Sequence, residues 1–202
     1  MIAAKPTAQS ANSAGSATEY AESIDGAPRL REASAPLPMA EVTPARQLDL
    51  ERFLYRQAEI LDDKKWDQWL ALFTADGKYW MPASEEQTTG EGAPSIFYED
   101  LDLMRVRMKR VMHPRAWSQK PPHRTAHVVS NVVVESLDAK TGDAVVRAKF
   151  YMTEFRRDTL RHFAGKYRHH LKKTPSGWAI RLQRVDLVNG EGTFDYVIQT
   201  WV

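Results

Sequence analysis

Beyond residue 124 the apolar residues recur at every second position, as they do in β-strands that bury one face. The stretch from Thr125 to Glu135 is dense in valine, a β-branched residue that packs well on a pleated sheet. Turn residues such as Gly142 and Gly177 separate this stretch from further candidate strands. The pattern predicts an antiparallel meander that continues with strands at 143–156, 159–173 and 177–189 and a shorter strand at 194–201.

Before that point the apolar residues follow a helical period. The first predicted helix has an apolar stripe formed by Leu50, Phe53, Leu54, Ala58 and Leu61. A second, two-turn helix is expected to start at Trp66 and to stop at Gly77, where glycine can adopt a positive φ. A short strand follows at 78–81, and Ser95 is expected to cap a third helix over 96–112.

Helices followed by long antiparallel strands predict an α+β domain. We expect three N-terminal helices packed against one face of a curved, mainly antiparallel sheet. Such an arrangement forms a cone, and a cone can hold a pocket.

The chain divides near residue 46. Residues 1–46 hold five of the eleven prolines and a single aromatic residue, Tyr20, so they offer little apolar surface to bury. We expect residues 1–46 to be a disordered, Ala/Ser/Pro-rich extension and residues 47–202 to be the folded domain. Translation from Met39 would also account for most of the extension, and the intact mass of the native protein would test it.

Composition excludes several classes of function. The chain has no cysteine, which excludes disulfides, a cysteine nucleophile and any cluster or zinc ion held by its own thiolates. Its 28 Lys and Arg nearly balance its 26 Asp and Glu, so bulk charge gives no support to nucleic-acid binding. No apolar run approaches the length of a membrane span, and no signal peptide is evident. We therefore expect a cytoplasmic protein that binds neither nucleic acid nor membrane.

The histidines do not form a recognisable metal motif. His123 and His127 are four residues apart, but they lie between Pro122 and a β-branched run, and no glutamate accompanies them as in HExxH. His169 and His170 are adjacent on a predicted strand, so their side chains should point to opposite faces. A structural role, or a place facing a partner or solvent, is the expectation for all of them.

Carboxylates near the predicted cone could act as a base, but simpler roles are available. Asp62, Asp63 and Asp76 lie near Tyr79, yet Asp62 and Asp63 with the two lysines that follow read as a solvated turn. A second acidic group, expected on the third helix beside Tyr98, could form salt bridges to Arg105 or to a partner; it comprises Glu99, Asp100 and Asp102.

Arginines alternate with methionine and aromatic residues along 105–110 and 156–161. Arginine and aromatic residues are enriched at protein interfaces. Because net charge is near zero, this pattern favours a polar protein interface over a nucleic-acid surface.

Three blocks together resemble a known family. They are FLYRQAEILDDKKWDQWLALFTADGKYWMP (53–82), SIFYEDLDLMRVRMKRV (95–111) and RTAHVVSNVVV (124–134). In order and spacing they are similar to the small, beta subunit of aromatic-ring-hydroxylating dioxygenases, the Rieske non-haem iron oxygenases, over residues 47–202. Within that family the first block looks most similar to subunits for benzoate, anthranilate or salicylate. The long N-terminal extension departs from the family pattern.

The resemblance implies an NTF2-like fold, shared with scytalone dehydratase, and a role in an oxidoreductase complex of aromatic catabolism. It implies an α3β3 hetero-oligomer whose alpha subunit carries the Rieske 2Fe-2S cluster and the mononuclear iron. Electrons would come from NAD(P)H through a reductase and, in some members, a ferredoxin. For this chain it implies no catalytic, cofactor-binding or metal-binding residue. We expect interface residues at Arg105, Arg107, Arg110, His113, Trp117, Arg124, His127, Arg156 and Arg157.

Two other functions remain open on sequence grounds. An autonomous dehydratase or isomerase of the same fold would need a buried Asp or His that points into a sizeable pocket. A plain interaction module would bind some other partner. A cone filled by aromatic side chains would argue against the enzyme; these are Trp66, Trp69, Phe73, Tyr79 and Phe150.

Overall fold

The computed structural model describes residues 40–194, 197–199 and 201–202. The first helix, α1 (Pro44–Asp62), begins three residues before the predicted domain boundary. Thr43 caps it, since its hydroxyl accepts a hydrogen bond from the backbone N–H of Arg46 at 3.3 Å. The predicted extension therefore overlaps the start of this helix, and its residues 1–39 lie outside the described part of the chain.

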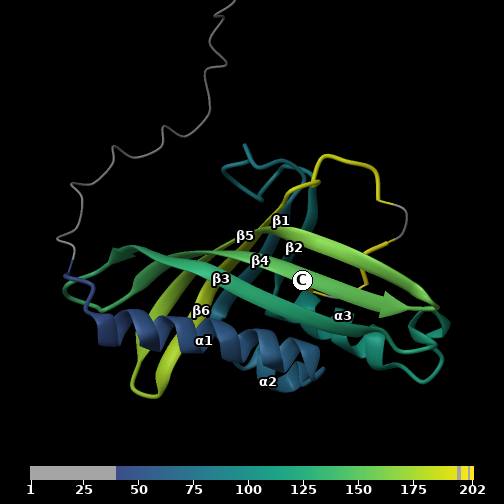
Figure 1. Cartoon of the computed structure of the whole chain (residues 1–202), viewed down its shortest axis with the longest axis horizontal. Coiled ribbons are helices and arrows are strands. Elements are labelled where there is room, and N and C mark those ends of the chain that lie inside the picture. Colours follow the sequence, from purple (N-terminus) through teal and green to yellow (C-terminus); the bar gives the residue numbers. More distant parts are fainter. Residues whose placement is uncertain (1–39, 195–196, 200) are drawn as a thin grey trace, which may run out of the picture. The chain divides into compact units, whose positions relative to one another are not determined.

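A six-stranded sheet curves over the helices (Figure 1). The strand order is β2-β1-β6-β5-β4-β3, and every neighbouring pair is antiparallel except β1 with β6. This confirms the predicted α+β class and the mainly antiparallel sheet. The strands are β1 (Phe73–Pro82), β2 (Ser95–Asp100), β3 (Arg124–Leu137), β4 (Ala144–Arg156), β5 (Thr159–Thr174) and β6 (Gly177–Leu187).

Two helix predictions were wrong at their ends. Helix α2 (Trp66–Leu70) has only 5 residues and is shorter than predicted. Phe73 already belongs to β1, where it pairs with Ile180 of β6. Gly77 does not cap a helix. A Cβ there would lie 2.9 Å from the carbonyl oxygen of Ile180, so glycine permits close approach of the two strands.

The third helix also starts later than predicted. Ser95–Asp100 forms β2, which pairs with β1, and helix α3 (Leu101–Met112) follows it. Asp100 caps this helix by accepting hydrogen bonds from the backbone N–H groups of Asp102 and Leu103. Two strands therefore separate α2 from α3, and the three helices do not all precede the sheet. A short 3-10 turn, η1 (Trp117–Gln119), lies in the connector to β3.

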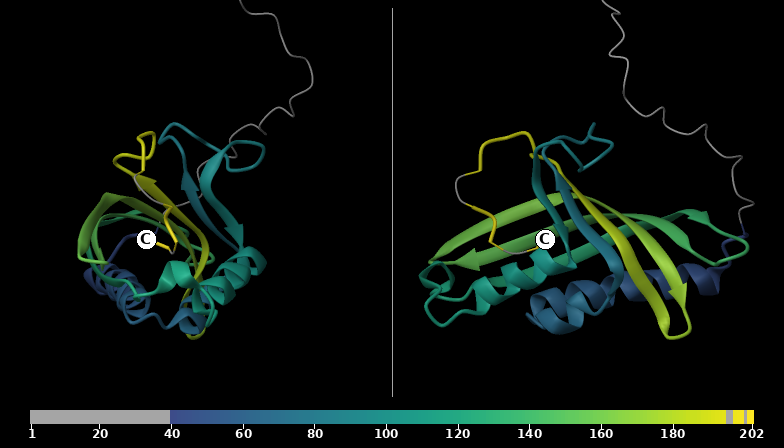
Figure 2. Two further views of the ribbon diagram at one scale, coloured as in Figure 1. Left: turned by 90° about the vertical axis from the view of Figure 1, so that its right-hand side faces the viewer. Right: turned by 180° about the vertical axis from the view of Figure 1, so that it is seen from behind.

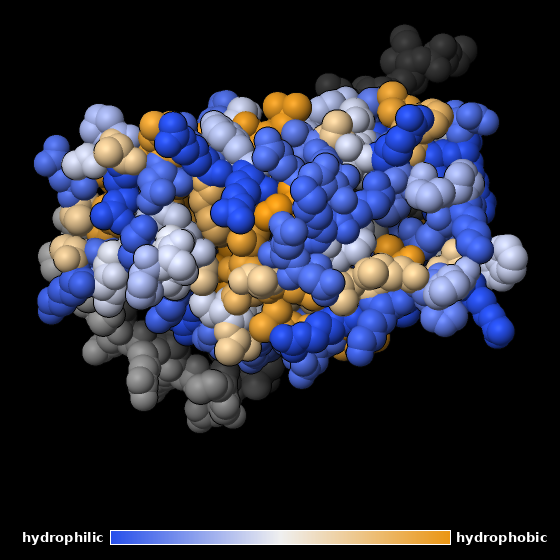
Figure 3. Space-filling model, turned by 90° about the horizontal axis from the view of Figure 1, so that it is seen from below, coloured by the Kyte–Doolittle hydropathy of each residue, from blue (hydrophilic) through white to orange (hydrophobic). Residues whose placement is uncertain are grey.

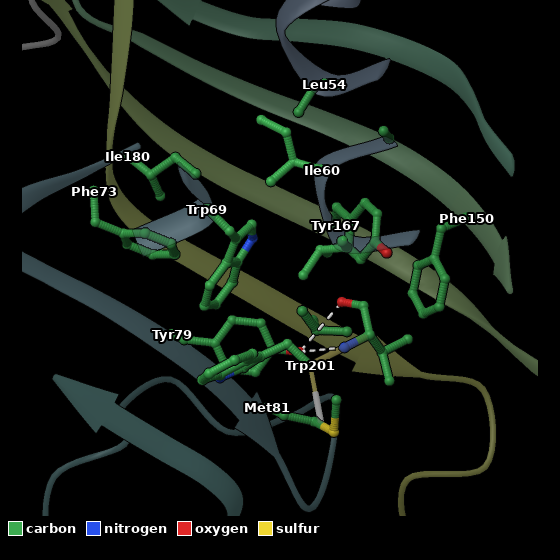
Figure 4. Packing of buried hydrophobic residues seen from close by; sticks show 14 of the residues in the cluster. Leu54, Ile60, Trp69, Phe73, Tyr79, Met81, Phe150, Tyr167, Ile180 and Trp201 are labelled. Carbon is green, nitrogen blue, oxygen red and sulfur yellow. Dashed lines mark hydrogen bonds between the residues drawn. The ribbon is translucent and has the colours of Figure 1, made fainter. Parts of the chain in front are cut away.

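The predicted strand at 194–201 was wrong for its described residues, which adopt no strand. Trp201 instead enters the cone and packs between Trp66 and Trp69, with ring centroids 5.7 and 4.3 Å away. The backbone N–H of Val202 donates to the Tyr79 hydroxyl at 3.2 Å (Figure 4). Figure 2 shows this end of the chain inside the curve of the sheet.

Within the described residues, no helix combines the length and the apolar character that crossing a membrane requires.

Candidate functional site

The pair most like a catalytic dyad joins α1 to β3. Asp62, the last residue of α1, has its Oδ1 2.7 Å from Nδ1 of His127, and its Oδ2 accepts the backbone N–H of His127 at 2.8 Å. The Thr125 hydroxyl donates to the same carboxylate at 2.7 Å. Asp62 is thus not part of a solvated turn, whereas Asp63 is exposed and pairs with Lys65.

The electrostatics of this pair indicate an ionised carboxylate that orients an imidazole. Burial alone would raise the pKa of Asp62, but the hydrogen bonds from His127 and Thr125 outweigh burial and hold the pKa below its ordinary value. The His127 side chain is 2% exposed, and its Nε2 has no hydrogen-bond partner among the described residues. Chemically, such an arrangement could orient a general base.

The small cavity inside the cone does not reach this pair, because neither His127 nor Asp62 lines it. A cavity of about 10 Å³ lies between α1 and the sheet, room for one water molecule. It is lined by Leu54, Gln57, Ala58, Leu61, Val129, Tyr167 and Gln183. The five aromatic residues expected to fill the cone are all buried: Trp66, Trp69, Phe73, Tyr79 and Phe150. This packing argues against an autonomous dehydratase or isomerase.

The remaining histidines are dispersed. His169 is buried and His170 is exposed, which confirms that they point to opposite faces of β5. His162 lies on the outer face with His170 and is 2.7 Å from the Tyr151 hydroxyl. Burial, with a smaller effect of the Lys64 and Arg156 charges, lowers the pKa of His123 to about 4. Across the described residues, no three His, Asp or Glu side chains are grouped as a metal ion would need.

The burial of His169 should make the folded chain less stable at acidic pH. Its side chain is fully buried with neither ring nitrogen hydrogen-bonded to any described residue, and burial lowers its pKa to about 3. As pH falls below about 6.5, His169 becomes protonated in the unfolded chain but stays neutral in the folded chain. The free energy of unfolding should therefore fall between pH 6.5 and about 3, by up to about 1.4 kcal/mol per pH unit from this residue.

Urea denaturation of His169→Leu at several pH values tests this expectation. The substitution should remove up to one proton from the pH dependence of the unfolding free energy, and the stability gained relative to wild type should grow steadily from pH 6.5 to about 3. Val146→Ala is the matched control, because Val146 is buried opposite His169 on β4 and carries no titratable group. That control should lower stability equally at each pH. An unchanged slope in His169→Leu would contradict the assignment.

A basic groove of about 470 Å³ brings together part of the predicted interface. We define the basic groove by its lining residues, Val106, Arg107, Lys109, Arg110, Val111, His113, Arg115, Ala116, Gln119 and Gln199. It lies between the second half of α3, the connector after it and the segment near the end of the chain. Arg107, Arg110 and His113 come from the predicted set, and Lys109 and Arg115 lie beside them in the same basic helix and connector.

Other predicted residues hold the connector in place. Arg156 donates to the carbonyl of Pro121 and Arg157 to the carbonyl of Lys120, both at 3.1 Å. Trp117 is 73% exposed, with the Lys120 ammonium 4.8 Å from its ring centroid. Arg124 is stacked over the ring of Phe155. These residues therefore lie on one surface region, at and next to the connector.

Three predicted interface residues have partners within the chain. His127 is buried against Asp62, and Arg105 pairs with Asp102 at 2.8 Å on the surface of α3. Arg107 is 18% exposed and donates from its Nε to Glu99 at 2.7 Å. Glu99 also accepts the indole N–H of Trp201 at 3.1 Å. The sequence placed Glu99 on a helix, so this buried pairing was missed.

The comparisons with known proteins decide the family. Residues 56–191 match the model for the ring hydroxylating beta subunit. The chain belongs to this family. The chlorobenzene dioxygenase subunit beta of Cupriavidus sp. (strain PS12) is 32% identical over 152 residues, which cover 70% of this chain and 81% of that protein. The 2-halobenzoate 1,2-dioxygenase small subunit of Burkholderia cepacia is 30% identical over 147 residues, 70% and 88% of the two chains.

A solved structure agrees with this assignment. The beta subunit of benzoate 1,2-dioxygenase from Burkholderia mallei aligns with a TM-score of 0.62 at 28% identity, covering 79% of this chain and 100% of that one. The architecture is the NTF2-like fold that the resemblance implied. The protein is thus a beta subunit of an aromatic-ring-hydroxylating dioxygenase, an oxidoreductase complex in which an alpha subunit is its partner.

The residues of this beta subunit do not fit the redox groups of such a complex. A Rieske cluster is held by two Cys and two His, and this chain has no cysteine. Mononuclear iron uses two His and one carboxylate, and no such group occurs in the described part of the chain. No redox step is therefore assigned to residues of this chain.

Proposed function

We propose that this beta subunit supports assembly of a terminal oxygenase with α3β3 stoichiometry and contributes no catalytic group of its own. The observation that carries the proposal is the filled cone. Its interior is packed with buried aromatic side chains, and the cavity between α1 and the sheet has a volume of about 10 Å³, too small for an aromatic substrate. The contribution of this beta subunit is then a rigid body with an external binding surface.

In this proposal the alpha subunit holds a Rieske 2Fe-2S cluster and a mononuclear iron, which supply electron transfer and oxygen activation. Electrons come from NAD(P)H through a reductase, with or without a ferredoxin, and the complex works in the cytoplasm, where that donor is available. The match to the family supports this division of roles.

The proposed substrate is an aromatic carboxylate of the benzoate class. The alignment with a benzoate dioxygenase beta subunit over its whole length and the relative from a 2-halobenzoate dioxygenase support it. A second candidate is an uncharged arene, which the relative from a chlorobenzene dioxygenase favours.

We further propose that seven of the nine predicted interface residues face the alpha subunit. Arg107 and His127 are left out because they pair with Glu99 and Asp62 within the chain. The seven are Arg105, Arg110, His113, Trp117, Arg124, Arg156 and Arg157, of which Arg156 and Arg157 also anchor the connector. Their grouping at and around the connector supports this proposal.

Purification of the tagged chain from its native host tests the assembly. We expect a stoichiometric larger subunit in the eluate, with iron and the visible absorption of a Rieske centre. The reduced complex should then hydroxylate benzoate in preference to chlorobenzene, as measured by product analysis of single turnovers. A colourless, self-associated chain would contradict the assembly, and preference for chlorobenzene would contradict only the substrate class.

A further inference from the structure

The basic groove contains positive charge that the described residues do not balance. Lys109, Arg110 and Arg115 have no side-chain hydrogen bond or ion pair with any of them. None of the ten lining residues is acidic, and two of them, Gln119 and Gln199, add amide groups. A cluster of like charges costs free energy through mutual repulsion unless an anion binds between them.

The groove also has an apolar component, which distinguishes it from a site for a free inorganic anion. Val106, Val111 and Ala116 form part of its lining. Met112 and Trp117 beside it are 58% and 73% exposed. Figure 3 shows the helix-bearing side of the molecule as mainly hydrophilic, with hydrophobic residues gathered in a band across it. Exposed apolar and aromatic side chains next to arginines are typical of protein-binding surfaces.

The walls of the groove are already held in place. Arg107 is fixed by Glu99 and lies 4.1 Å from the ring centroid of Phe97. Gln119 in the connector donates to Gln199 at 3.2 Å, which links two walls of the groove. Because these side chains are ordered before a partner arrives, binding loses less conformational entropy.

We propose that the basic groove receives an acidic segment of the alpha subunit, whose carboxylates pair with Lys109, Arg110 and Arg115 while an apolar side chain packs on Trp117. This inference rests on the proposed function, because it takes the alpha subunit as the partner. Charge complementarity selects an acidic segment, and the apolar rim selects a polypeptide rather than a small anion. A volume of about 470 Å³ accommodates several side chains.

The test measures the affinity of the full-length chain for its own alpha subunit at several salt concentrations. Lys109→Glu with Arg110→Glu should weaken binding at least tenfold at low salt and should reduce its salt dependence. The matched control is Arg52→Glu with Arg56→Glu. These two arginines are exposed on α1, have no side-chain partner among the described residues and give the same change of net charge. The control should stay within about twofold of wild type.

The possible outcomes distinguish failure of the proposed function from failure of the groove assignment alone. If the wild-type chain binds no alpha subunit, the proposed function fails, and the groove assignment fails with it. If wild type binds and both double variants bind equally well, only the groove assignment is overturned. Loss of self-association with unchanged alpha binding would assign the groove to a second copy and would also overturn the proposed alpha-subunit contact.

Thermal unfolding of each variant verifies folding. Trp117→Ala removes no charge, so it should weaken binding to the alpha subunit without altering the salt dependence of that binding.

Discussion

Replacing Trp201 by alanine should lower the free energy of unfolding by about 3–5 kcal/mol, the range for large-to-small changes of buried aromatic residues. Trp201 is 2% exposed and contacts Trp66 and Trp69 inside the cone. Its indole N–H also satisfies a buried oxygen of Glu99, which the substitution would leave with one partner fewer. Urea denaturation at pH 7 measures the loss.

Adding indole to the Trp201→Ala variant tests whether the lost stability comes from the space that the side chain vacates. The Trp201→Ala cavity should bind indole, because it is lined by aromatic rings and retains the Glu99 acceptor for the ring N–H. Indole at 100 times its dissociation constant should restore about 2.7 kcal/mol. Val197→Ala, at an exposed position of the same segment, should change stability little and should not respond to indole. A loss below about 1 kcal/mol in Trp201→Ala would show that Trp201 is not part of the core.

Arg107→Leu should also destabilise the chain by about 3–5 kcal/mol, because it leaves the Glu99 carboxylate buried without its cation. Both side chains are largely buried, and the Arg107 guanidinium additionally stacks on Phe97. Arg105→Leu, two residues away, removes an exposed pair with Asp102 and should cost less than about 1 kcal/mol.

Thermal and urea unfolding of these two variants distinguish a structural arginine from a surface one. Equal, small effects would mean that Arg107 is available to a partner, as its place in the predicted interface assumed. A large effect confined to Arg107 would assign its main role to holding β2, α3 and Trp201 together.

The long strands could be predicted because an apolar period of two, sustained along most of a segment, is incompatible with a helix that buries one face. The boundary between α2 and β1 could not, since WDQWLALF fits a helix in isolation and only pairing with Ile180 places Phe73 in a strand. Likewise Ser95 and Asp100 are both good caps, and the choice between them depends on β2 pairing with β1.

The candidate site was predictable only where it is local in sequence. The basic residues of α3 and the connector are close along the chain, so their grouping on one surface follows from the pattern. Asp62 and His127 are 65 residues apart, and Glu99 and Trp201 are 102 apart. Such pairs are created by tertiary packing, which no spacing rule reveals. Trp201 was predicted to lie in a strand because its segment alternates, whereas burial in the cone decides its position.

The filled cone has a mechanical consequence as well. Hydrostatic pressure unfolds proteins largely by eliminating internal voids, and the volume change scales with the void that the native state contains. An enzyme of this architecture with an open pocket carries such a void by necessity. In this beta subunit the cavity between α1 and the sheet amounts to about 10 Å³, so the collapse of that cavity contributes almost nothing to the volume change of unfolding.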